Sequence, residues 1–230
     1  MERITKAVCR QERHPLIIEI GPGQGALTAL LLDRADHVVV VEIDPLMIDH
    51  LRDRFPDHPS LTIHQGDVLK TDLAQWGPAV LAGNLPYYIT SPILDCIFAA
   101  RQVLTEATVL VQKEVAERMV APPGSRDYGF LSVRTQLHAE AKLMFKVPPG
   151  SFTPPPKVDS AVVHMKVRQG ENQEEFLAFA GRCFGQKRKT LRNNLAPYYG
   201  KEKIEAQPES GLRAEQMSIA QLRDLMLRLA

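Results

Sequence analysis

The sequence predicts an α/β fold: a mostly parallel sheet with an antiparallel edge, followed by a small C-terminal helical domain. Short apolar runs alternate with helical patterns through the first two thirds of the 230 residues. This alternation is typical of a parallel sheet that is covered on both faces. Two later runs alternate apolar and polar residues with no long helix between them, which indicates an antiparallel hairpin at the sheet edge. Beyond the hairpin only short helical patterns remain.

The expected elements follow one another in strand-helix order. The apolar runs that predict buried strands are 16–20, 38–42, 61–65, 79–83 and 108–112. The helical stripes are 26–34, 46–55 and 93–104. The hairpin strands are 140–147 and 160–167, with the proline-rich PPGSFTPPPKVD between them. The pattern changes near residue 170, so we expect one domain over 1–169 and a second over 170–230.

The composition excludes several classes of protein. The net charge of +1 means that any basic surface must be local. Cys9, Cys96 and Cys183 form no C-x-x-C, which argues against a disulfide framework or a zinc knuckle, and the histidines show no metal-binding spacing. No apolar run reaches membrane-spanning length, and the start has no apolar signal core. We therefore expect a cytoplasmic protein without a metal and without membrane contact.

A glycine turn follows the first predicted strand. Glu19-Ile-Gly21-Pro-Gly23-Gln-Gly25 leads directly into a predicted helix. Glycines let the backbone turn tightly and approach a ligand closely, with helix amides facing it. The simplest interpretation is a plain strand-to-helix turn. Gly21-x-Gly23-x-x-Ala26 also satisfies the dinucleotide fingerprint, so a dehydrogenase is an alternative.

One polar side chain follows each of the next three strands. Glu42 ends the second strand, where a carboxylate can accept both hydroxyls of a ribose. Asp67, after the third strand, is placed to accept from the exocyclic amine of adenine, and Asn84 follows the fourth strand. The carboxyl ends of parallel strands meet at one crevice. Because a dehydrogenase has no use for the "NLPY" turn at Asn84, the ordered set favours S-adenosylmethionine over a dinucleotide.

In this order, the motifs resemble those of the ribosomal RNA small-subunit adenine N6,N6-dimethyltransferase family. The resemblance covers nearly the whole chain and rests on Glu-x-Gly-x-Gly-x-Gly at 19–25, Glu42, Gly66-Asp67, Asn84-Leu85-Pro86-Tyr87, FTPPPKV at 152–158 and QKRKTLR at 186–192. It implies a Rossmann-like class I methyltransferase with a seven-stranded sheet. It also implies S-adenosylmethionine as the cofactor and, as the partner, ribosomal RNA in a small subunit or its precursor. We expect a monomer.

The resemblance also assigns roles to individual residues. The cofactor-binding residues that it implies are Glu19, Gly21, Gly23, Gly25, Glu42, Ile43, Asp67, Val68 and Asn84. The residues implied for methyl transfer are Asn84, Leu85, Tyr87 and Phe152.

The chemistry of the target explains the Asn-Leu-Pro-Tyr quartet. The exocyclic amine of adenine is a poor nucleophile because its lone pair is delocalised into the ring. The Asn84 side-chain oxygen and the Leu85 carbonyl, held by Pro86, can each accept one amine hydrogen and aim the lone pair at the sulfonium methyl. Tyr87 supplies an aromatic face for an unstacked base, and the family implies Phe152 as the second face. Tyr88 lies outside the quartet and could simply pack.

A local basic run, Arg182-Cys-Phe-Gly-Gln-Lys-Arg-Lys-Thr-Leu-Arg192, carries five positive charges and no acid. We interpret it as a phosphate-binding patch that positions RNA without reading its sequence. A solvated face is the simpler alternative. The expected RNA-binding residues are Lys113, Arg118, Lys187, Arg188, Lys189 and Arg192.

The start of the chain departs from the family pattern. Family members usually begin with a basic tail and a Phe-Gly-Gln-Asn-Phe-Leu segment that closes over the cofactor, whereas Met1 stands in what resembles the following helix. Two alternatives stay open. A large-subunit adenine methylase of the macrolide-resistance type is disfavoured by the run at 186–192. A non-catalytic pre-ribosome-binding assembly factor is favoured by the missing segment and disfavoured by the intact Glu42, Asp67 and Asn84.

Overall fold

The computed structural model describes residues 1–9, 13–152, 154–170 and 173–230. Thr153 of the FTPPPKV motif, residues 10–12 of the N-terminal stretch and residues 171–172 of the polar linker lie outside the described residues. The chain divides into two compact units. The first unit consists of Met1–Ala116 with His138–Gln169, and the second of Glu117–Leu137 with Gly170–Ala230.

The second unit contains a segment that the order of the sequence assigns to the first domain. The first unit ends at Gln169 and the second continues from Gly170, and residues 117–137 also belong to the second unit. The physical reason is burial, because Ala121, Tyr128 and Val133 of this segment lie in the hydrophobic core of the helical unit. None of the helices in the described part of the chain is long and apolar enough to cross a membrane.

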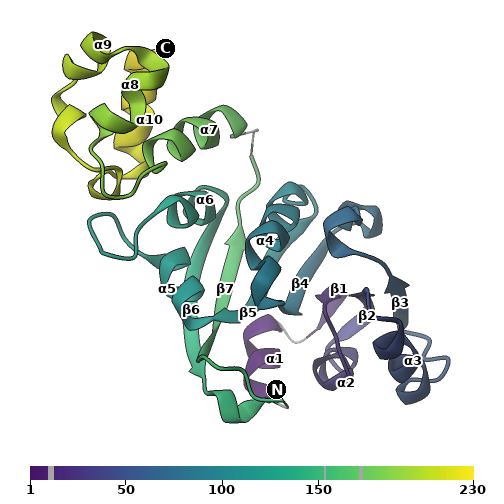
Figure 1. Cartoon of the computed structure of the whole chain (residues 1–230). Coiled ribbons are helices and arrows are strands. Elements are labelled where there is room, and N and C mark those ends of the chain that lie inside the picture. Colours follow the sequence, from purple (N-terminus) through teal and green to yellow (C-terminus); the bar gives the residue numbers. More distant parts are fainter. Residues whose placement is uncertain (10–12, 153, 171–172) are drawn as a thin grey trace. The chain divides into compact units, whose positions relative to one another are not determined.

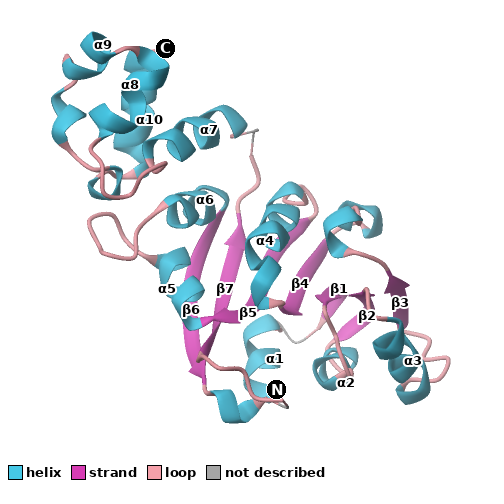
Figure 2. Cartoon of the chain, viewed as in Figure 1, coloured by secondary structure: helices cyan, strands magenta, loops and turns pink. Residues whose placement is uncertain are grey.

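A seven-stranded sheet forms the centre of the first unit, with the strand order β3-β2-β1-β4-β5-β7-β6 (Figure 2). Its strands are β1 (His14–Ile20), β2 (Ala35–Glu42), β3 (Leu61–Gln65), β4 (Ala79–Asn84), β5 (Leu104–Gln112), β6 (Ala139–Val147) and β7 (Ser160–Val167). Strands β1 to β5 pair in parallel, and β7 pairs antiparallel with both β5 and β6. The predicted fold class is confirmed. The strand order reverses between β1 and β4, which is where open parallel sheets bind ligands.

Helices α1, α2 and α3, which Figure 1 labels, contribute residues to one hydrophobic cluster with the sheet. The helices of the first unit are α1 (Glu2–Val8), α2 (Ala26–Leu32), α3 (Pro45–Arg54), α4 (Thr90–Ala99) and the start of α5 (Lys113–Val120), with short 3₁₀ turns η1 (Val68–Lys70), η2 (Leu73–Trp76), η3 (Tyr87–Ile89) and η4 (Pro149–Ser151). Leu31 and Leu51 pack there against Ile17 and Val40. Ile18 is also fully buried, although successive strand residues point to opposite faces. Covering both faces explains why the central strands are apolar runs.

The predicted helix over 93–104 is shorter in the structure. Helix α4 ends at Ala99, and the Ala100 amide donates to the Cys96 carbonyl at 3.1 Å. The chain then turns, since the Val103 amide donates to the Ala100 carbonyl at 3.0 Å. Leu104 is fully buried and already pairs with Ala79 as the first residue of β5. The apolar residues at the end of the predicted stripe therefore belong to the next strand.

The second unit is helical. Its elements are the end of α5, α6 (Phe130–His138), α7 (Glu174–Cys183), α8 (Leu191–Tyr199), α9 (Lys201–Glu205), α10 (Ile219–Leu229) and the 3₁₀ turns η5 (Pro208–Gly211) and η6 (Ala214–Gln216). Phe179, Leu195 and Leu225 are among the residues that form its buried core. The apolar positions of α10 recur at Leu222, Leu225 and Leu229, so one face of this helix is buried.

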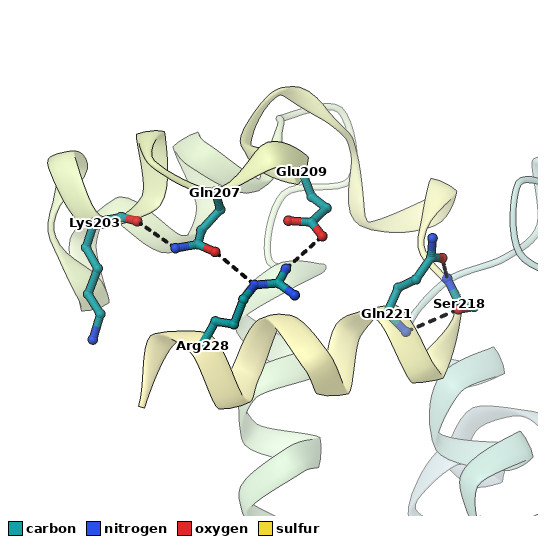
Figure 3. Close-up of polar contacts among 6 residues, drawn as sticks. All are labelled: Lys203, Gln207, Glu209, Ser218, Gln221 and Arg228. Atoms are coloured by element: carbon teal, nitrogen blue, oxygen red, sulfur yellow. Dashed lines mark hydrogen bonds and ion pairs between the residues drawn. The ribbon is translucent and has the colours of Figure 1, made fainter.

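Polar contacts fix both ends of α10 (Figure 3). At its start the Gln221 amide donates to Ser218 Oγ at 3.2 Å and the Ser218 amide donates to Gln221 Oε1 at 2.9 Å, which is a capping box. Near its end Arg228 donates from Nε to Gln207 Oε1 at 3.0 Å and pairs with Glu209 at 2.7 Å. These contacts tie α10 to the segment around η5.

Candidate active site

The glycine turn after β1 has the backbone geometry that only glycine adopts easily. Gly21, Gly23 and Gly25 have φ values of +66°, +53° and +75°. A Cβ atom on Gly21 would lie 3.3 Å from the Asn84 carbonyl oxygen, and one on Gly25 would lie 2.7 Å from the Phe55 ring. A Cβ on Gly23 would meet nothing within 4 Å. The turn is therefore packed at both ends and faces open space at Gly23.

Glu42, at the carboxyl end of β2, is held by the backbone around it. Its Oε1 accepts from the amides of Ile43 at 2.9 Å and Asp44 at 3.0 Å. Its Oε2 accepts one long hydrogen bond of 3.4 Å from the Gly23 amide. The side chain is 9% exposed. One carboxylate oxygen thus fixes the group, and the other, beside the open part of the glycine turn, keeps capacity to accept from a ligand.

Asp67 is built in the same way on the neighbouring loop. The Gly66 amide donates to the Glu42 carbonyl at 2.8 Å, which brings this loop to the end of β2. Asp67 Oδ1 accepts from the Leu69 amide at 3.0 Å, and Asp67 caps the turn η1. Val68 is buried, whereas Ile43 is 62% exposed and presents an apolar surface beside Glu42.

Asn84 ends β4 with its side chain exposed. Within the described residues this side chain makes no hydrogen bond or ion pair, so its amide is available to a ligand. Asn84 pairs with Leu110 in the sheet, and the next amide, that of Leu85, donates to the Leu110 carbonyl at 3.0 Å. Leu85 is 1% exposed. The backbone that carries the Leu85 carbonyl is therefore fixed, while the Asn84 side chain projects into solvent next to Gly21.

The aromatic residues near Asn84 have different surroundings. Tyr87 is half-buried, and its hydroxyl forms a 2.5 Å hydrogen bond with the Ser160 hydroxyl at the start of β7. Tyr88 is 86% exposed, so the alternative that it packs is wrong. Phe152 is half-buried in a cluster that includes Leu110, the sheet partner of Asn84. Asn84 and Phe152 are therefore both neighbours of Leu110, and Tyr87 contacts Ser160 at the end of the proline-rich loop.

Glu19 lies beneath the glycine turn. Its side chain is 1% exposed, and its Oε2 accepts from the Thr28 hydroxyl of α2 at 2.6 Å. Burial raises the pKa of this carboxyl to about 7; the Thr28 hydrogen bond opposes that rise and the nearby Glu42 charge adds to it. Glu19 therefore ties α2 to β1 on either side of the glycine turn.

We call these residues together the carboxyl-end site: the turn 19–25, Glu42 with Ile43, Asp67 with Val68, and Asn84 to Tyr87. Hydrogen bonds and close backbone packing connect its parts across β1, β2, the β3 loop and β4. In the described part of the chain, no group of three or more His, Cys, Asp and Glu side chains could hold a metal ion.

The predicted RNA-binding cations fall into different environments. Lys187 donates to the Arg126 carbonyl at 2.6 Å, and Arg192 pairs with Glu205 at 3.4 Å. The side chains of Arg188 and Lys189 are exposed and form no hydrogen bond or ion pair with the described residues. Of the two cations predicted on α5, Lys113 belongs to the first unit, and Arg118, which is exposed, belongs to the second unit with the basic run.

A buried amide that the sequence did not single out orders the basic loop, which we define as residues 184–190. Asn194 is 8% exposed, and its Nδ2 donates to the carbonyls of Cys183 at 2.8 Å and Gln186 at 3.2 Å. Its Oδ1 accepts from the Gln186 amide at 3.2 Å. The position of Asn194 in the first turn of the helix after a charged loop was the available signal. Ser160 was also missed, because its partner Tyr87 lies 73 residues away in sequence. Thr28 was missed although its partner Glu19 lies only nine residues before it.

A glycine turn, a fixed acid and an Asn-Leu-Pro-Tyr turn at the carboxyl ends of this seven-stranded sheet define a class I methyltransferase. The family model for ribosomal RNA adenine dimethylase matches residues 1–230, so the chain belongs to that family.

Individual similar proteins support this family assignment. The chain is 41% identical to ribosomal RNA small subunit methyltransferase A of Acidobacterium capsulatum, over 95% of this chain and 85% of that protein. It is 42% identical to the protein of the same name from Aromatoleum aromaticum, over 90% and 82%. The crystal structure of a dimethyladenosine transferase from Plasmodium falciparum aligns with a TM-score of 0.83 and 26% identity, over 98% and 93%. That of the 23S rRNA methyltransferase ErmE aligns with a TM-score of 0.74 and 29% identity, over 99% and 97%.

Proposed function

We propose that this chain transfers methyl groups from S-adenosylmethionine to the exocyclic amine of adenines in small-subunit ribosomal RNA. The observation that carries the proposal is the carboxyl-end site, where an exposed Asn84 amide adjoins the fixed Leu85 backbone beside an open glycine turn. The curated relatives at about 40% identity bear the name of small-subunit methyltransferases, which favours the small over the large subunit.

The fixed acids fit the adenosyl part of the cofactor. Glu42 Oε2 has capacity to accept from ribose hydroxyls, since its partner oxygen carries the two short backbone hydrogen bonds. Asp67 Oδ1 is held by the Leu69 amide, which leaves Oδ2 to accept from the adenine amine. Ile43 offers an exposed apolar surface to a flat ring. The positive φ of Gly23 lets the backbone approach the ligand without a side chain in the way.

When bound, S-adenosylmethionine supplies an electrophilic methyl group on a positively charged sulfur. The chain's own residues prepare the nucleophile. The Asn84 side-chain oxygen and the Leu85 carbonyl each accept one hydrogen of the adenine amine, so the nitrogen lone pair is directed away from the ring. Tyr87, anchored through Ser160, presents a fixed ring to the target base. The proton that the amine loses after transfer can pass to water, because Asn84 is exposed.

The experiment that tests the proposal is radiolabelled methyl transfer to undermethylated small subunits, with undermethylated large subunits as the parallel substrate. We expect label in small-subunit adenines, with the modified positions mapped by mass spectrometry. Label only in the large subunit would support the large-subunit alternative. Binding of S-adenosylmethionine and of small subunits without any methyl transfer would support the assembly-factor alternative.

A further inference from the structure

The second unit contains a polar groove between α7 and α8, with a volume of about 460 Å³. We call it the α7/α8 groove. Gly181, Arg182, Gln186, Asn193 and Tyr198 are among the residues that line it. All of its lining residues lie within 178–198, so the groove belongs to a single unit, and its lining residues lie on both sides of the basic loop in sequence as well as within it. No role in the proposed reaction has been assigned to it.

One wall of the groove is a stack of flat groups. The Arg182 guanidinium lies 4.9 Å from the centroid of the Tyr198 ring and donates to the Tyr199 hydroxyl at 3.0 Å. Tyr198 is nevertheless 59% exposed. A guanidinium held over an aromatic ring is a surface on which a further planar group can stack. An exposed tyrosine fixed in this way favours a flat ligand.

The groove also carries hydrogen-bonding groups for the edge of a nucleobase. The side chains of Asn193 and Gln186 are exposed at the groove, and each carries both a donor and an acceptor for the edge of a base. The basic loop continues directly from Gln186 to Arg188 and Lys189, whose charges are exposed. A phosphate attached to a base in the groove would therefore meet positive charge within the same loop.

We propose that the α7/α8 groove binds one unpaired nucleotide of the RNA substrate, with the base stacked on Tyr198 and its neighbouring phosphates at Arg188 and Lys189. This inference rests on the proposed function for its RNA ligand. The base must be unpaired, because a nucleotide within a duplex has no free face to stack on a side chain. Asn194 acts as a positioning residue, since it holds the loop that carries Gln186.

The test uses the full chain and two labelled RNAs: a hairpin with an unpaired loop, and a fully paired duplex with the same stem. Affinities are measured by fluorescence anisotropy at several salt concentrations. Tyr198→Ala should weaken binding of the looped hairpin by roughly 5- to 150-fold, the range expected for one base stacked on an aromatic ring, and should leave duplex binding unchanged. Because no phosphate contact is lost, the salt dependence should stay that of the wild type.

Two control variants separate stacking from general damage. Tyr198→Phe keeps the ring and should bind the hairpin as the wild type does. Leu227→Ala removes another large exposed side chain of the second unit, at 66% exposure, outside the groove. It should have no effect. A hairpin series in which each loop nucleotide in turn is replaced by an abasic one should contain one member on which Tyr198→Ala has no further effect.

Equal hairpin affinities for wild type and Tyr198→Ala would overturn the groove inference and leave the methyltransferase proposal standing, because methyl transfer to small subunits is measured separately. Equal losses on hairpin and duplex would also overturn it, since Tyr198 would then act on the fold of the unit. Binding of neither RNA by the wild-type chain would overturn the inference as well. Normal hairpin binding with no methyl transfer would count against the proposed function alone.

Discussion

The carboxyl-end site and the basic loop are built in opposite ways. At the carboxyl-end site the acidic groups are fixed: Glu42 is 9% exposed, and one of its oxygens accepts from two backbone amides. In the basic loop the charges of Arg188 and Lys189 are exposed, and the fixed group is the uncharged Asn194 behind them. A small ligand with defined hydroxyls and amines needs acceptors at set positions. A phosphate backbone needs local positive charge on a loop of defined shape.

The largest effect is expected at Asn84, whose proposed role is to orient the adenine amine. Asn84→Ala should lower the rate of methyl transfer by about 100- to 1,000-fold, as loss of one such positioning group does in other enzymes. Folding should be little affected, because the exposed side chain makes no hydrogen bond with the described residues. Single-turnover kinetics at saturating cofactor and RNA isolate the transfer step.

Asn84→Asp is the matched variant. Its carboxylate can still accept amine hydrogens, but it adds a negative charge beside the sulfonium, which loses its positive charge during transfer. We expect retained cofactor binding and partial activity. A near-wild-type transfer rate in Asn84→Ala would show that the carboxyl-end site does not act by orienting the amine.

The second prediction concerns the buried carboxyl of Glu19 at the start of the glycine turn. The pKa of Glu19 is raised from 4.5 to about 7, chiefly by burial. Between these two values the folded protein holds a proton that the unfolded chain has lost, so stability falls as the pH rises through this window. Ionisation of Glu19 should cost on the order of 3 kcal/mol above pH 7. Glu19→Gln should remove this pH dependence while keeping an oxygen that accepts from Thr28.

Urea unfolding of wild type and Glu19→Gln at several pH values from 4.5 to 8 provides the measurement. The free energy of unfolding of the variant, relative to wild type, should rise across this window and level off above it. A difference that stays constant with pH would mean that the Glu19 carboxyl is not perturbed as its surroundings imply.

The third prediction sharpens the contrast between fixed acceptors and exposed charge. Glu42→Ala should weaken cofactor binding about 5- to 150-fold, which corresponds to the loss of about 1–3 kcal/mol for a ligand hydrogen bond to a buried acceptor. Asp67→Ala should act in the same direction with a smaller effect, because Asp67 is half-exposed. Calorimetry on the free protein measures both.

Glu42→Gln, which can still accept from the Ile43 and Asp44 amides, separates loss of charge from loss of the local backbone contacts. Unchanged affinity in both alanine variants would remove the cofactor assignment.

The extent to which the sequence predicted the structure depended on where each contact partner lies. An apolar run marked β3, and an alternation of apolar and polar residues marked β7, each at its observed bounds. The start of β5 was missed because Glu106 interrupts the run; in the sheet it lies opposite Lys166, where a polar residue is tolerated. The order of the motifs located Glu42, Asp67 and Asn84 along the chain, since consecutive strand ends meet at one edge of a parallel sheet.

Partners that are far apart in sequence left no local signal. Nothing near Tyr87 pointed to Ser160, which lies 73 residues away and holds its hydroxyl. The burial of residues 117–137 in the helical unit was equally invisible, because the contacts that place this segment come from α7 to α10. In the basic run, composition counted five charges, but only the folded loop distinguishes the occupied Lys187 and Arg192 from the exposed Arg188 and Lys189.

The last and smallest effect tests that distinction. Neutralising all four cations, Lys187, Arg188, Lys189 and Arg192, should weaken RNA binding and flatten its salt dependence without changing cofactor affinity. The structure divides this effect unequally. The double variant Arg188→Gln with Lys189→Gln should lower the salt slope by about 1.4, since each phosphate contact to a single strand contributes about 0.7. The double variant Lys187→Gln with Arg192→Gln should change the slope by less than half as much, because these side chains already have partners within the unit.

The measurement is the affinity for one single-stranded RNA at four or more salt concentrations. Equal slopes for the two double variants would mean that the charge of the run, rather than the shape that Asn194 gives the loop, decides RNA binding. That result would reduce the difference between the two regions to one of charge alone.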